Sequence, residues 1–152
     1  MSAERLVLAA MELAAEAGRR GDPPFGALLV DAAGEIVARA ANRQLSGNDP
    51  TAHSEIELLR VAARAGLVPP LTGFTLVVNA EPCSMCASAI VKAAPSTLLY
   101  GAPHEPHMDP NLAVADVFAT ARNPPRIVSG VLAAESAAQI ASFRSTGEPP
   151  ID

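Results

Sequence analysis

Aromatic residues are scarce in this chain of 152 residues: they make up 3% of it, and tryptophan is absent. The core must therefore be built from alanine, valine, leucine and isoleucine. Charged residues amount to only 18%, whereas hydrophobic residues reach 49%, and this balance excludes intrinsic disorder. The length predicts a single domain over residues 1–152, in which 145–152 form a loose tail.

Positive charge is equally scarce. Lys92 is the only lysine, the arginines are scattered along the chain, and the formal net charge is -5. An acidic surface repels the phosphates of nucleic acids. We therefore expect a small-molecule substrate and no nucleic-acid partner.

Long hydrophobic runs are missing as well. No apolar stretch approaches the roughly 18 residues that span a bilayer, and Glu4, Glu12 and Glu16 do not fit the apolar centre of a signal peptide. We expect a cytoplasmic protein that does not associate with membranes. Cysteine is limited to two residues three positions apart, which in a reducing compartment favours metal or redox chemistry over a structural disulfide.

Hydrophobic periodicity and turn signals predict an alternation of helices and strands. Helices are expected at 3–18, 53–65, 84–93, 111–121 and 131–143, and strands at 25–30, 36–40, 74–79, 97–100 and 127–129. The first two strands form a hairpin, because only a short turn separates them. The alternation after the hairpin implies an α/β fold, with a largely parallel sheet covered by helices on both faces.

Three residues at expected helix starts have the chemistry of metal ligands: His53, Cys83 and Cys86. The two cysteines are three positions apart, so they share one face of a helix and can bind one ion. Their place in the first turn after Pro82 favours thiolates, because the helix dipole stabilises negative charge there. One histidine and two cysteines leave the fourth position of a zinc ion open, which is typical of catalytic sites. We therefore predict one Zn²⁺ ion per chain.

Glu55 follows the histidine ligand by two positions. On an ideal helix such residues do not face each other, so Glu55 is not expected to be a fourth ligand. Near the helix end it can instead reach a water molecule at the metal and act as proton acceptor and donor, provided that its surroundings raise its pKa toward neutrality. We predict that Glu55 is the catalytic residue.

Other interpretations of the same residues stay open. Cys83 and Cys86 have the spacing of a thioredoxin-like redox pair, and His104 or His107 could close a purely structural zinc site as fourth ligand. A further alternative is a zinc-stabilised binding module without activity. The presence of Glu55 favours the enzyme, because an inactive module has no need of a carboxylate over the metal.

The segments NDPTAHSE (48–55) and EPCSMC (81–86) resemble the zinc-binding motifs of the cytidine deaminase-like superfamily, in particular its guanine deaminase and tRNA adenosine deaminase branches. The resemblance extends over most of the chain. It implies a three-layer α/β/α fold, with a five-stranded mixed sheet between helices. It also implies one catalytic zinc ion and hydrolytic release of ammonia from an amino-substituted heterocycle. By the same analogy the chain is expected to form a homodimer.

The resemblance also suggests which residues contact the substrate. Asn42 matches an asparagine that contacts the substrate ring in these families. Phe25, Ser54 and Glu81 are further candidates for the pocket. Ser54 departs from the family pattern, which usually has alanine between the histidine ligand and the catalytic glutamate.

A free nucleobase or a related heterocycle is the expected substrate. Guanine is the leading choice, because the motifs look most like the guanine deaminase branch; isocytosine, cytosine and triazine-like rings stay open. In guanine deaminases an acidic residue from the C-terminal region reads the ring, and Asp109 and Asp116 are the candidates here. Deamination of adenosine in tRNA is the alternative. It calls for a basic face, whereas the last helix offers only Arg144.

Overall fold

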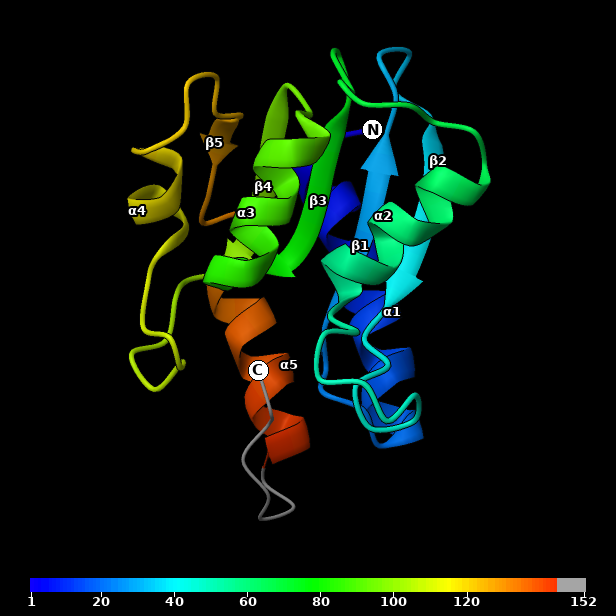
Figure 1. Ribbon diagram of the computed structural model, residues 1–152. Helices are drawn as coiled ribbons and strands as arrows, with labels where there is room; N and C mark the ends of the chain where they lie inside the picture. Colours follow the sequence, from blue (N-terminus) through cyan, green and yellow to red (C-terminus); the bar gives the residue numbers. More distant parts are fainter. Residues whose placement is uncertain (145–152) are drawn as a thin grey trace.

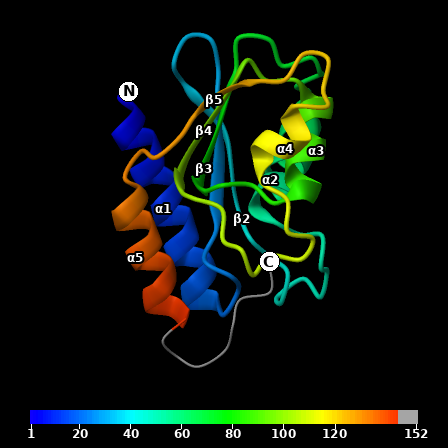
Figure 2. The ribbon, with the colours of Figure 1, turned by 90° about the vertical axis from the view of Figure 1, so that its left-hand side faces the viewer.

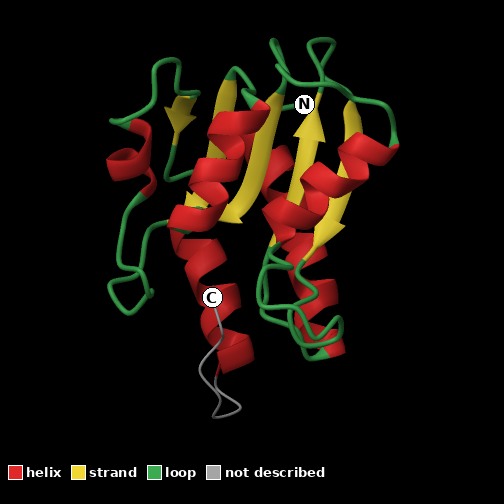
Figure 3. Ribbon diagram, viewed as in Figure 1, coloured by secondary structure: helices red, strands yellow, loops and turns green. Residues whose placement is uncertain are grey.

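The computed structural model describes residues 1–144, which form five helices and five strands (Figures 1 and 3). The helices are α1 (Ala3–Arg20), α2 (Ser54–Arg64), α3 (Ser84–Ala93), α4 (Val114–Phe118) and α5 (Ala133–Arg144), and the strands are β1 (Gly26–Val30), β2 (Ile36–Ala41), β3 (Thr75–Ala80), β4 (Thr97–Ala102) and β5 (Arg126–Val128). All ten expected elements are present. The tail predicted at 145–152 lies outside the described residues.

The strands form one mixed sheet in the order β2-β1-β3-β4-β5. β1 is antiparallel to both of its neighbours, whereas β3, β4 and β5 are parallel. The mixed sheet of five strands is confirmed, but the largely parallel sheet is wrong at the pairing of β1 with β3. The α2 crossover makes β2 and β3 parallel to each other, and they lie on either side of β1, which the hairpin has already reversed (Figure 1).

Helices cover both faces of the sheet, which confirms the three-layer architecture. α1 and α5 lie on one face, and α2, α3 and α4 lie on the other (Figure 2). Successive strand residues point to opposite faces: Leu28 and Val77 pack toward α1, whereas Leu29 and Leu76 pack toward α2 and α3. Within residues 1–144, no helix has both the length and the apolar character needed to cross a membrane.

The bounds of α1 and α4 depart from the expected ones, each for a visible reason. α1 continues through Gly18 because Gly21, with φ 93°, provides the left-handed C-cap. Gly18 stays inside the helix, where a Cβ would collide with the ring of Phe143. α4 is shorter than the expected 111–121. It begins at Val114, whose backbone N–H donates to the carboxylate of Glu81 at 3.0 Å.

Candidate active site

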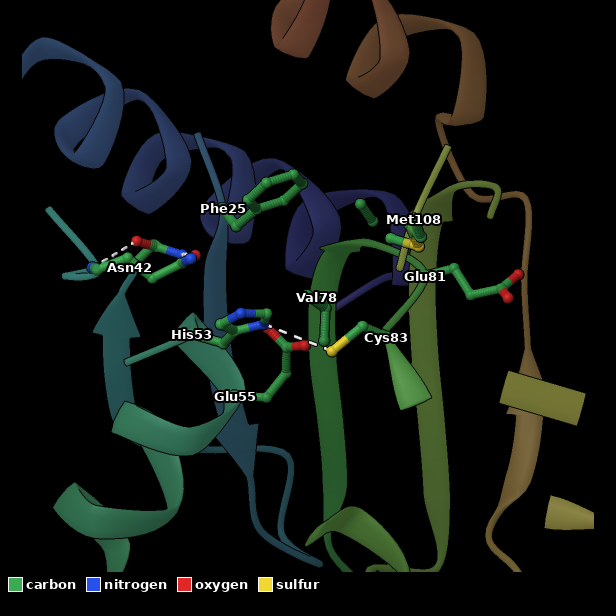
Figure 4. A pocket seen from close by; sticks show the side chains of 10 residues that line it. Phe25, Asn42, His53, Glu55, Val78, Glu81, Cys83 and Met108 are labelled. Carbon is green, nitrogen blue, oxygen red and sulfur yellow. Dashed lines mark hydrogen bonds between the residues drawn. The ribbon is translucent and has the colours of Figure 1, made fainter. Parts of the chain in front are cut away.

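The two helices that carry the expected ligands each begin at a ligand. His53 is the N-cap residue of α2 and Cys83 is that of α3, both with extended backbone. These two helix starts lie next to each other (Figure 4). His53 Nδ1 lies 3.5 Å from Cys83 Sγ and 3.5 Å from Cys86 Sγ. The three ligand atoms all lie within 4.8 Å of one another.

This cluster fits a tetrahedral zinc ion. At the usual Zn–N and Zn–S bond lengths, two ligand atoms of such an ion lie about 3.6 Å apart, which agrees with both nitrogen–sulfur separations of 3.5 Å. The donor set of one imidazole and two thiols suits zinc and leaves one position for water or substrate. His53, Cys83 and Cys86 are therefore the residues that would hold the metal.

The surroundings favour negative charge at the cysteine pair. A hydrogen bond from Cys86 lowers the pKa of the Cys83 thiol to about 4, against the opposing effect of burial. The same hydrogen bond, together with burial, raises the pKa of the Cys86 thiol well above its ordinary value. The two thiols are thus coupled through one hydrogen bond, which favours negative charge at Cys83. The dipole of α3 adds to the stabilisation of negative charge at this helix start.

Glu55 lies in the first turn of α2 and is 4% exposed. Burial raises the pKa of its carboxyl group, with a weaker opposing effect from the neighbouring His53. Its side chain points into the space beside the ligands (Figure 4). Ser54 is fully buried, and its hydroxyl donates to Glu55 Oε1 at 2.5 Å. Ser54 therefore contacts the expected catalytic carboxylate and is not among the residues that line the pocket.

A pocket of about 310 Å³ opens in front of the ligands and Glu55. Phe25 and Asn42, both predicted as substrate contacts, line it, and Asn42 lies on the far side of His53 from Cys83 (Figure 4). Its remaining lining residues are Gln44, Val78, Ala80, Glu81 and Met108.

Phe25 reaches the pocket because the chain around it is held tightly. Asn79 is fully buried; its Oδ1 accepts from the N–H of Gly26 at 2.9 Å, and its Nδ2 donates to the carbonyl of Pro24 at 3.1 Å. A Cβ at Gly26 would lie 2.4 Å from the carbonyl oxygen of Ala10, so only glycine permits this approach of β1 to α1. The two contacts fix where the phenyl ring projects.

The loop that carries Asn42 is held from outside by Asp22. The Asp22 side chain is fully buried; its Oδ1 accepts from the backbone N–H groups of Leu45 and Ser46 at 2.9 and 2.8 Å. Arg20 joins the two segments, because its Nε donates to Asp22 and its Nη2 donates to the carbonyl of Asn42, both at 2.8 Å. Burial raises the pKa of Asp22, but the hydrogen bonds from Ser46, Arg20 and Leu45 outweigh it, and the net pKa is lowered.

Glu81, expected as a substrate contact, has its carboxylate engaged on the side away from the pocket (Figure 4). Its Oε1 accepts from the hydroxyl of Tyr100 at 2.9 Å and from the backbone N–H of His104 at 3.3 Å. Its Oε2 accepts from Val114, as described for α4. Glu81 nevertheless lines the pocket, so its expected contact with the substrate stays a prediction. Through its carboxylate, Glu81 ties the 103–113 segment, with the pocket residue Met108, to the sheet.

The two acidic candidates from the C-terminal region differ in position. Asp109 borders a second pocket, which shares His53 and Cys83 with the main one. Asp116 lies on α4, where it is exposed and accepts from the backbone N–H of Ala113 at 3.0 Å. It caps a helix and is not among the residues that line the pocket, so the structure does not support its expected role in substrate binding.

His104 and His107 do not join the metal cluster that the described residues form. His104 Nε2 lies 2.6 Å from the side-chain oxygen of Asn111, and His107 Nδ1 lies 3.2 Å from the carboxylate of Glu105. A closed site with one of them as fourth ligand is therefore not what this geometry provides. The metal position stays open toward the pocket.

Among the polar residues that line or support this site, sequence reasoning missed Gln44 and Asp22. Gln44 is 4% exposed and lines the pocket beside Asn42. Its only signal in the sequence is its place two residues after Asn42, in a segment expected to be a polar loop. For Asp22 the sequence contains no signal of a role at the site, since apart from Arg20 its hydrogen-bond partners lie 23 and 24 residues further along the chain.

Comparison with known proteins places this geometry in a family. The model of the cytidine and deoxycytidylate deaminase zinc-binding region matches residues 1–102. A tRNA-specific adenosine deaminase of Agrobacterium fabrum is 39% identical over 136 residues, which are 86% of each chain. A guanine deaminase of Bacillus subtilis is 37% identical over 105 residues, 68% of this chain and 67% of that protein.

Among solved structures, one from work on A-to-I editing by tRNA:A34 deaminases at the wobble position of transfer RNA has a TM-score of 0.79. It is 38% identical, and the match covers 89% of this chain and 98% of that one. The chain spans 16%, 86% and 57% of the length of three of the curated relatives that it matches.

Proposed function

Since the chain belongs to the cytidine and deoxycytidylate deaminase family, whose members are zinc-dependent hydrolases of C–N bonds, we propose that it converts an adenosine in a tRNA anticodon loop to inosine. The reaction rests on one observation: Glu55 lies in a pocket beside the His53, Cys83 and Cys86 cluster. The choice of substrate is supported by relatives named tRNA-specific adenosine deaminases, one of which matches over 86% of each chain.

This proposal corrects two expectations from the sequence, a free nucleobase as substrate and the lack of a nucleic-acid partner. They are overturned by the similarity to tRNA deaminases at 39% identity in sequence and 38% in a solved structure. Net charge misled because it averages over the whole surface. An unpaired loop base is recognised by its extrusion into a pocket, by stacking and by hydrogen bonds. Arg43, between two pocket residues, is exposed and offers local positive charge.

In the proposed reaction, Glu55 transfers two protons of a water molecule to the adenine. When bound, zinc supplies the positive charge that makes a water molecule acidic at neutral pH. Glu55 accepts a proton from the water and delivers it to N1 of the adenine as the oxygen adds to C6. Glu55 then accepts the second proton of the former water molecule and delivers it to the amino group at C6. The C–N bond breaks, and ammonia leaves. The ring keeps the proton at N1 and a carbonyl at C6, so the atoms balance.

The buried position of Glu55 suits this shuttle. Its raised pKa brings the carboxyl group closer to neutrality, where it can both accept and donate a proton. Asn42 and Phe25 line the pocket in which the base would lie. The open backbone N–H groups in the first turns of α2 and α3 point toward the ligand cluster and favour negative charge that develops on the reacting oxygen.

A binding module without activity is the second candidate. The presence and burial of Glu55 argue against it, because a buried carboxylate beside the ligands is unfavourable unless it has a role. Assembly as a homodimer and a cytoplasmic location, both expected from the sequence, stay predictions.

The decisive experiment uses the zinc-loaded protein and an anticodon stem-loop RNA with adenosine at the wobble position. Inosine formation is measured by nucleoside chromatography, with free adenine, guanine and cytosine tested for ammonia release in parallel. We expect turnover of the RNA by the wild type and a loss of about 10³-fold in Glu55→Ala. Turnover of a free base without turnover of the RNA would overturn the proposal, and zinc binding without any turnover would support the binding module.

A further inference from the structure

Gln44 occupies an unusual position for a loop glutamine. It lies in the segment after β2, is 4% exposed, and lines the same pocket as His53 and Glu55. The backbone on both sides is fixed: the N–H of Asp49 donates to the carbonyl of Gln44 at 3.0 Å, and Asp22 holds the two residues that follow Gln44. The backbone hydrogen bonds on both sides therefore fix the position of the Gln44 side chain.

The hydrogen bonds around Gln44 determine which way its amide group faces. Its backbone N–H, which can only donate, lies 2.8 Å from Asn42 Oδ1. Asn42 Nδ2 is then directed at Gln44, where it donates to Oε1 at 2.5 Å. Because Oε1 is the accepting end, Nε2 of Gln44 is the end that is left over.

This leftover group is a buried donor. Among the described residues, Nε2 of Gln44 has no hydrogen-bond partner, although it is inaccessible to solvent. Such a group is unfavourable in an empty pocket and favourable as soon as a ligand offers an acceptor. By contrast, Asn42 has already used its oxygen and one N–H on Gln44. Of the side-chain N–H groups of Asn42 and Gln44 that have no partner, most therefore belong to Gln44.

We propose that Gln44 is a substrate-binding residue, and that its Nε2 donates to a ring-nitrogen acceptor of the purine, N7 or N3. The inference rests on the proposed function, in which Glu55 serves N1, so that N7 and N3 are the acceptors left on adenine. Deamination changes neither of them. Gln44 therefore binds the adenosine and the inosine equally well, and its contribution lies in affinity and not in the chemical step.

The test measures kcat and KM on the wobble-adenosine stem-loop RNA for the wild type, Gln44→Ala and Gln44→Glu. Gln44→Glu keeps the acceptor for Asn42 but replaces the Nε2 donor by an oxygen. Gln139→Ala is the matched control, since the side chain of Gln139 donates to the carbonyl of Met11 between α1 and α5 and is not among the residues that line the pocket. We expect KM to rise about 10-fold or more in both Gln44 variants, with kcat within about 2-fold.

Modified RNA tests the same inference without relying on the stability of a variant. Stem-loops with 7-deazaadenosine or 3-deazaadenosine at the wobble position each lack one acceptor. For the wild type, KM should be about 10-fold higher on one of these RNAs than on the unmodified RNA. For Gln44→Ala, KM should be the same on that RNA and on the unmodified one, because both changes remove the same hydrogen bond. Fluorescence anisotropy with inosine-containing RNA should show a matching loss of affinity in the variant.

The outcomes separate the two proposals. If the wild type does not deaminate the RNA, the proposed function fails and the role of Gln44 falls with it. If the wild type is active but the Gln44 variants keep its KM, or if neither deaza substitution matters, the role of Gln44 alone is overturned. A loss confined to kcat would also overturn it, since it would show that Gln44 acts on the chemical step.

Discussion

The pocket has two walls that are built in different ways. The metal wall consists of His53, Cys83 and Cys86 with Glu55, all at the starts of α2 and α3. The amide wall consists of Asn42 and its hydrogen-bonded neighbour Gln44, in a loop without regular structure. The first wall is fixed by local helix geometry, whereas the second depends on contacts between segments far apart in the chain.

The difference teaches where function can be read from local sequence. A helix start fixes its own side chains, so two short motifs are enough to place the metal ligands. The amide wall has no such internal support. It is held by Asp22 and Arg20, which reach across more than twenty positions to Leu45, Ser46 and Asn42. Changes to the two walls should therefore fail in different ways.

The largest effect is expected from Cys83→Ala, which removes one of the three ligands of the metal wall. The variant should lose bound zinc and all measurable turnover, because two remaining ligands hold zinc weakly. Metal analysis of the purified protein and the inosine assay check this. Stripping the wild type with a chelator serves as control and should be reversed by added zinc. Full zinc occupancy in the variant would contradict the assignment of Cys83.

Glu55→Ala should separate metal binding from chemistry. Zinc should stay at about one ion per chain, whereas kcat should fall by about 10³-fold, within the range of lost acid–base catalysis. Glu57→Ala is the control on the same helix, because Glu57 faces Arg60 at the surface. Activity retained in Glu55→Ala would show that another group moves the protons.

The metal wall could be predicted from the sequence because its chemistry and its spacing coincide. The expected bounds of α3, 84–93, agree with the structure, and Pro82 marks its start. The sequence pattern also located the pocket residue Phe25 and, through the family resemblance, Asn42. It could not show that the Glu81 carboxylate faces Tyr100, because that contact depends on the pairing of β3 with β4.

The remaining errors share one physical cause. The antiparallel pairing of β1 with β3 and the anchoring of the loop by Asp22 both depend on which distant segments meet. Periodicity reports which side of an element is buried and says nothing of its partner. Net charge failed for a related reason, since it carries no information on where the charges lie.

A smaller effect, and one on the amide wall, is expected from Asp22→Asn. The variant loses a buried carboxylate that accepts hydrogen bonds from Leu45, Ser46 and Arg20. We expect the free energy of unfolding to fall by about 2 kcal/mol and KM for the RNA to rise, with zinc retained. Asp31→Asn is the control, because Asp31 caps an exposed turn. Urea unfolding at neutral pH measures the free energy of unfolding of the wild type and of both variants.

The pH dependence of this loss has a definite sign. The pKa of Asp22 in the folded protein lies below its ordinary value of 3.8. The carboxylate therefore adds stability that is fully present above pH 3.8 and is lost as the pH falls through the folded pKa. The difference in unfolding free energy between wild type and Asp22→Asn should be constant above that range and shrink below it. A difference that grows on acidification would contradict the network.

The smallest effect is expected from Ser54→Ala, which returns the metal wall to the residue common in the family. The Ser54 hydroxyl donates to Glu55 Oε1, so it restricts the rotation of the catalytic carboxylate without contacting the pocket. Its loss should lower kcat by about 3-fold and leave KM and zinc content unchanged. Ser88→Ala, at an exposed position of α3, is the control. A change in KM instead of kcat would show that Ser54 acts on the substrate, as the sequence suggested. It would also show that the metal wall, which otherwise binds the metal and transfers protons, contributes to substrate specificity.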